Sequence, residues 1–126
     1  MGSQAEFIEA WQRLDLRHLE VIAKIGRSPQ LAKTSVPLQH FIARSLNSEA
    51  DHREHFATKA DQKPDFDDWS DGELADAYFG CLLVERAVEG TDERLSEFAA
   101  LLRLCVCTEM AERLTAMQMA KDLHDV

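Results

Sequence analysis

The sequence predicts an all-α fold, a single-domain antiparallel bundle of four main helices over residues 1–126. Three observations support this prediction. Apolar residues recur every three to four positions along four long segments, the spacing that places them on one face of a helix. Capping patterns precede helix starts, as at Ser70 with Glu73. The alternation of apolar and polar residues that a half-buried strand requires is nearly absent.

Length and composition fit one globular domain with its own core. The chain has 126 residues, of which 45% are hydrophobic and 29% are charged. Its formal net charge of -9 argues against a nucleic-acid partner, since such binding depends on Lys and Arg. Three cysteines in apolar segments, no secretory signal and no apolar run of membrane length favour a cytoplasmic protein that does not enter a membrane.

The first two helices are expected over about residues 4–25 and 36–60. Their apolar stripes contain Phe7, Trp11, Leu14, His18, Ile22 and Ile25, and then Leu38, Phe41, Ile42, Ser45, Glu49, His52 and Phe56. Gly26 follows the first stripe, where a left-handed helix cap is expected. The connection leaves room for one extra short helical turn near 29–34.

The third and fourth helices are expected over about residues 71–89 and 92–124. Ser70 with Glu73 predicts a capping box before the third, and Thr91, followed by two acidic residues, predicts a cap before the fourth. Gly90 lies between them, at a position typical of a left-handed cap.

A surplus of apolar residues on these last two helices predicts a protein interface. The third helix is apolar nearly all round, which indicates burial on both sides. A single layer of four helices cannot bury both sides of one member. We therefore expect a homodimer or a protein partner to cover six residues: Phe79, Leu82, Leu83, Leu101, Leu104 and Met119.

Five polar residues fall on faces that the pattern predicts to be buried: His18, Glu49, His52, Glu85 and Glu109. A buried carboxylate requires a cation, an arginine or water as compensation. Under a structural interpretation, Glu109 pairs with Arg113 one turn later and His18 is hydrogen-bonded in the core. Under a functional one, the five residues bind a divalent metal, and oxygen and nitrogen ligands without thiolate suit Fe, Mn or Zn.

The segment Glu49-Ala-Asp-His52 resembles the Glu-x-x-His spacing of ferritin-like di-iron bundles, which use it twice. The resemblance implies redox or hydrolytic chemistry at a carboxylate and histidine site. The second copy is missing here, because Glu112 stands three residues after Glu109 where that family has histidine.

The segment Glu73-Leu-Ala-Asp76 resembles half of the motif of all-α nucleoside triphosphate pyrophosphatases related to MazG. The resemblance implies Mg²⁺ held by carboxylates against phosphates. The preceding Glu-Glu-x-x-Glu segment of that family has no counterpart here.

The leading hypothesis is a small, acidic, non-enzymatic interaction or regulatory protein. It would act by dimerisation or by binding a protein partner through residues 71–89 and 92–124, and no cofactor is expected under this hypothesis. A metal-binding bundle and a MazG-like pyrophosphatase are the two alternatives.

Overall fold

The computed structural model describes the backbone of residues 3–53 and 65–124, with side chains over 5–49 and 65–123. This described part is all-helical, which confirms the predicted fold class. It contains six helices and no strand: α1 Ser3–Gln12, α2 Leu16–Gly26, α3 Pro29–Thr34, α4 Val36–Arg53, α5 Asp71–Val88 and α6 Glu93–His124. The predicted bundle of four main helices is not confirmed. Within the described ranges, no helix is long and apolar enough to cross a membrane.

The prediction of one continuous helix over residues 4–25 is wrong, because the chain breaks after Gln12. Asp15 has extended backbone angles and caps α2. Its carboxylate accepts a hydrogen bond from the His18 backbone N–H at 3.0 Å, and its own N–H donates to Nδ1 of His18 at 3.1 Å. These two bonds satisfy backbone donors at a helix start. The apolar spacing in the sequence does not reveal this break, because Leu14 before Asp15 and His18 after it are both buried.

The later helices begin close to where the sequence predicts. The short turn expected near 29–34 is α3, capped by Ser28. The capping box of Ser70 with Glu73 is confirmed at the start of α5. At the start of α6 the cap is Asp92 rather than Thr91, since Oδ1 of Asp92 accepts from the Arg94 N–H at 2.7 Å. Residues 54–60 of the predicted second helix, with Phe56, lie outside the described residues.

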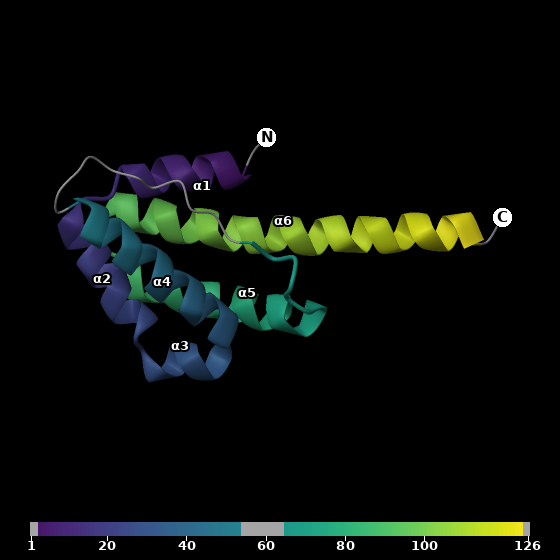
Figure 1. The fold of residues 1–126 in the computed structure, drawn as a ribbon, viewed down its shortest axis with the longest axis horizontal. Coiled ribbons are helices and arrows are strands. Elements are labelled where there is room, and N and C mark those ends of the chain that lie inside the picture. Colours follow the sequence, from purple (N-terminus) through teal and green to yellow (C-terminus); the bar gives the residue numbers. More distant parts are fainter. Residues whose placement is uncertain (1–2, 54–64, 125–126) are drawn as a thin grey trace.

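Helix α6 is the longest helix, and two of the other helices pack along it. It packs mainly against α5 and α1, whereas α2 pairs with α4, and α3 contacts α4 and α5. Figure 1 shows α1 and α5 alongside the first half of α6, and the second half of α6 extending past every other helix. Within the described ranges, the other helices therefore cover only part of α6.

All six helices contribute buried side chains to the core, which includes α6 as far as Val106. Aromatic rings join α1 to α6, because the Phe7 ring centroid is 5.6 Å from that of Trp11 and 5.1 Å from that of Phe98. The apolar residues of the two predicted stripes are largely buried, among them Leu14, Ile22, Leu38 and Ile42. The buried residues of α5 and α6 include Leu74, Ala77, Cys81, Val88, Leu95, Leu102 and Val106.

Two glycines act by letting helices approach closely. A Cβ at Gly80 of α5 would lie 2.7 Å from Cδ2 of Leu38 and 3.2 Å from Cδ1 of Leu31. A Cβ at Gly26, the last residue of α2, would lie 2.9 Å from Cγ2 of Ile42. Gly26 is therefore a packing residue rather than the predicted left-handed cap. Gly90, with φ of 77°, does adopt the left-handed conformation predicted for it.

Replacement of Gly80 by valine is expected to destabilise the fold. Valine is a better helix former than glycine, so propensity alone predicts a small gain. We expect overpacking against Leu31 and Leu38 to dominate and to lower the free energy of unfolding by about 1–3 kcal/mol. Urea denaturation measures the change, and Gly72→Val, at an exposed α5 position, is the matched control. Equal stability of Gly80→Val and wild type would contradict this packing account.

Candidate interaction surface

Among the side chains that the structure describes, the predicted metal ligands do not gather around one point. Glu49 is buried at 2% exposure and takes part in a polar or electrostatic interaction. The side chain of His52 lies outside the described residues. Within the part of the chain that the structure describes, no three His, Cys, Asp or Glu side chains are grouped as they would be around a metal ion.

Two of the predicted ligands, Glu85 and Glu109, are members of separate ion pairs. Glu85 of α5 accepts a hydrogen bond from Nε of Arg103 on α6. This hydrogen bond is the largest cause of the raised pKa of Arg103. Glu109 accepts from Nε of Arg113 at 2.9 Å, which confirms the pair that the sequence predicts. Neither carboxylate needs a metal ion to balance its charge.

Arg113 also connects α6 to the start of α5. Its Nη1 lies 3.0 Å from Oδ1 of Asp71, the first residue of α5, and its Nη2 donates to the Phe66 carbonyl oxygen at 2.7 Å. Hydrogen bonds to Glu109 and then Asp71 are the main causes of its raised pKa. The sequence indicates the first contact by its spacing of four. Nothing in the pattern indicates the two long-range contacts.

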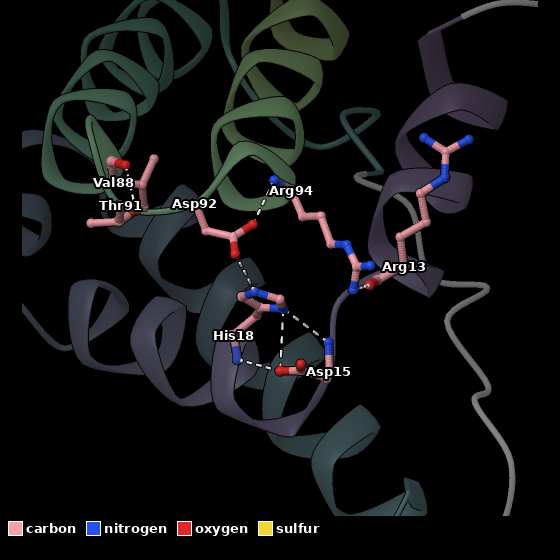
Figure 2. Close-up of polar contacts among 7 residues, drawn as sticks. All are labelled: Arg13, Asp15, His18, Val88, Thr91, Asp92 and Arg94. Carbon is pink, nitrogen blue, oxygen red and sulfur yellow. Dashed lines mark hydrogen bonds and ion pairs between the residues drawn. The ribbon is translucent and has the colours of Figure 1, made fainter.

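His18 connects the start of α2 to the start of α6 (Figure 2). The ring is 4% exposed, and its Nε2 lies 3.2 Å from Oδ2 of Asp92. Because Nδ1 accepts a hydrogen bond from Asp15 in the capping box, the ring proton belongs on Nε2, on the side of Asp92. His18 is thus a core histidine with two acidic neighbours.

Both acidic neighbours of His18 are held in their charged form. Donation from the His18 backbone N–H is the largest cause of the lowered pKa of Asp15. Donation from the Arg94 backbone N–H, followed by the contact with His18, lowers the pKa of Asp92. Arg94 also donates from its side chain to the Arg13 carbonyl at 3.4 Å, next to the end of α1. These contacts hold the α1–α2 junction against the first turn of α6.

One carboxylate of the MazG-like half-motif, that of Glu73, also has a hydrogen-bond partner nearby in the sequence. Oε1 of Glu73 accepts a hydrogen bond from the Ser70 backbone N–H at 2.8 Å, as the capping box requires. Asp76 is exposed on α5. The carboxylate of Glu73 therefore has a structural partner at the helix start.

Four of the six predicted interface residues are exposed. Their exposed fractions are 57% for Phe79, 38% for Leu82, 42% for Leu104 and 62% for Met119. Leu83 and Leu101 are half-buried, and Leu101 packs against the core. The predicted face on α5 and α6 is therefore present but smaller than expected.

Three of these residues are exposed on the neighbouring helices α5 and α6, and we call them the outer patch: Phe79, Leu82 and Leu104. Leu82 of α5 lines the same hollow as Ala100 of α6. The two helices are consecutive and lie side by side (Figure 1). One turn forward from Ala100 is Leu104, and one turn back from Leu82 is Phe79.

A second apolar surface lies on the projecting half of α6, where Leu114 and Met117 are 65% and 60% exposed. Both line a groove of about 220 Å³, together with Asp71, Leu74, Met110 and Arg113. Leu123 and the predicted Met119, 79% and 62% exposed, lie on other sides of the same helix. The lengths of the predicted helices could have indicated this surface. The predicted fourth helix, over residues 92–124, is much longer than the predicted third helix, over residues 71–89. Because a short connection makes the two run antiparallel, the third helix cannot cover the end of the fourth.

Comparison of the chain with protein-family models, with curated proteins and with solved structures finds no match in any of the three. The function is therefore inferred from the surfaces and contacts described above.

We expect Asp15 and Asp92 to make the stability of the protein sensitive to acid. Their folded-state pKa values lie below the ordinary 3.8, so the unfolded chain binds more protons in acid. The contribution of these two carboxylates to stability is complete above pH 3.8. It is lost as the pH falls through their lower folded-state pKa values. When the pH is lowered from about 6 to about 3, the free energy of unfolding should therefore fall less for Asp92→Asn than for wild type.

Urea denaturation at several pH values measures this difference. Asp76→Asn, which removes the same charge from an exposed position within α5, is the control and should keep the wild-type pH dependence. Identical pH profiles for Asp92→Asn and wild type would contradict the role of Asp92.

Proposed function

We propose that this chain is a small, acidic protein-interaction module that binds a second copy or another protein through apolar side chains of α5 and α6. The observation that carries the proposal is the exposure of large apolar side chains on two surfaces of these helices, outside an otherwise well-filled core. Contiguous exposed apolar residues with a polar surround mark interaction sites in many folded proteins.

The outer patch has the chemistry of a partner-binding surface. Phe79, Leu82 and Leu104 are large enough for each to contribute about 1.5–3 kcal/mol when it is fully removed from water. The ion pair of Glu85 with Arg103 lies beside them and carries no net charge. A partner is therefore expected to present apolar side chains to the patch and polar groups around them.

Charge and cysteine chemistry support the type of partner and the compartment. The net charge of -9 disfavours nucleic acid and other polyanions. The cysteines Cys81, Cys105 and Cys107 are free thiols, and burial raises the pKa of Cys81, which keeps it protonated and unreactive. Free thiols are typical of a reducing compartment, which supports the proposal of a cytoplasmic protein.

Phe79→Lys and Leu104→Lys are expected to remove partner binding and to leave the fold intact, because both side chains are largely exposed. Sedimentation velocity of the fluorescently labelled chain, alone and in an extract of its native cells, reports the size of its complexes. We predict a species larger than one chain for wild type and a smaller fraction of it for each variant.

The control is Gln12→Lys, which adds the same charge at an exposed position on α1. Urea denaturation of every variant separates loss of binding from loss of folding. A wild-type chain that sediments as a single copy under all conditions would refute the proposed function.

A further inference from the structure

The negative charge of the chain is distributed unevenly along the sequence. Residues 21–48 contain no aspartate or glutamate, but they contain four basic residues: Lys24, Arg27, Lys33 and Arg44. The formal charge of this segment is therefore +4 in a chain of net charge -9, so the rest of the chain carries -13. All four basic side chains are exposed. An acidic protein thus has one basic region, formed by the end of α2, by α3 and by most of α4.

Two of these basic residues, Lys24 and Arg27, lie three residues apart where α2 ends. Within the described residues, neither side chain has a carboxylate at salt-bridge distance, whereas Arg13, Arg103 and Arg113 each pair with one. Lys24 and Arg27 are therefore cations without a compensating charge, and they are available to an anion from outside the chain.

These two cations line a groove of about 430 Å³ between α2 and α4, which pack against each other (Figure 1). Four apolar residues line the same groove: Leu16, Leu19, Ala23 and Leu46. Leu19 and Leu46 belong to the core, whereas Leu16 is 45% exposed. The volume is in the range of roughly 300–1,000 Å³ that is usual for ligand pockets.

The order of the lining residues along α2 gives the groove a direction. Leu16 is the first residue of α2, and Arg27 follows its last. Eleven residues of helix rise about 16 Å, a distance that an extended alkyl chain of medium length can span. The groove therefore has an apolar end at the start of α2 and a cationic end where the helix finishes.

We propose that this groove binds a free fatty acid of medium chain length. Its carboxylate contacts Lys24 and Arg27, and its alkyl tail lies over Leu19 toward Leu16. The site shares no lining residue with the outer patch or with the groove beside Arg113, so it is a further site, independent of the proposed function.

Charge complementarity selects an anionic head group. Glu20 and Asn47 also line the groove, and with Lys24 and Arg27 they give it a formal charge of +1 in a strongly acidic chain. The net charge of -9 repels an anionic membrane surface, which favours a free fatty acid over a phospholipid in a bilayer. The groove has room for the single tail of such an acid.

Isothermal titration calorimetry of the purified full chain with octanoate and decanoate, below the concentrations at which they form micelles, tests the site. A fully buried methylene raises affinity about fourfold, so in a groove open on one side we expect about twofold for each added methylene. Decanol, with the tail of decanoate and no charge, is expected to bind about tenfold more weakly, because hydrogen bonds to charged groups are stronger than neutral ones.

Paired double variants test the role of the two cations. Lys24→Gln with Arg27→Gln is expected to weaken decanoate binding about tenfold or more. Lys33→Gln with Arg44→Gln is the matched control, since it removes one lysine and one arginine from the same basic region but outside the groove. Its affinity for decanoate is expected to stay within about twofold of wild type.

The apolar end is tested by Leu16→Ser, which is expected to lower the gain in affinity from octanoate to decanoate. Leu123→Ser, at an exposed apolar position of α6, is its control and should keep the wild-type gain. Urea denaturation of every variant confirms that the fold is retained.

Several outcomes would overturn the inference. No heat of binding with decanoate, an affinity that does not depend on tail length, or equal losses in the two double variants would each do so. Cosedimentation of the chain with phosphatidylglycerol vesicles, without binding of decanoate, would assign the basic region to a membrane surface instead. None of these results bears on the outer patch, so the proposed function is tested separately by its own variants.

Discussion

The constraint on which this structure depends is the mismatch in length between α6 and the helices that cover it. Helix α6 has 32 residues, whereas α5 has 18 and α1 has 10. Its core-facing stripe is buried as far as Val106 and then emerges into solvent. Hydrophobic burial is the main favourable contribution to folding. An apolar stripe that extends beyond the helices packed against it is therefore the feature that most requires explanation.

Polar contacts fix α6 near both ends of its buried part. At its start, Asp92 caps the helix and faces the buried ring of His18. About six turns later, Arg113 binds Asp71 and the Phe66 carbonyl. Both sets of contacts join segments far apart in the sequence, and both set the position at which the core ends. Two of the polar residues that suggest a metal site, His18 and Glu85, thus connect other helices to α6.

The sequence predicts those features that depend on local periodicity and capping. The all-α class, the boundaries of α5 and the contact of Glu109 with Arg113 follow from spacings of three, four or seven residues. The break at Asp15 could not be predicted in this way, because the apolar stripe continues through it. Only the position of His18 in the structure shows that this residue belongs to a capping box and not to the middle of a helix. The outer patch follows from surplus apolar residues, whereas the surface around Leu114 depends on where α5 ends in space.

Amide hydrogen exchange over residues 112–124, measured at low protein concentration, tests the central claim most directly. If the stripe extends beyond the helices packed against it, these amides exchange rapidly, while the amides of the buried half of α6 stay protected. Protection of residues 112–124 equal to that of the buried half would contradict the account.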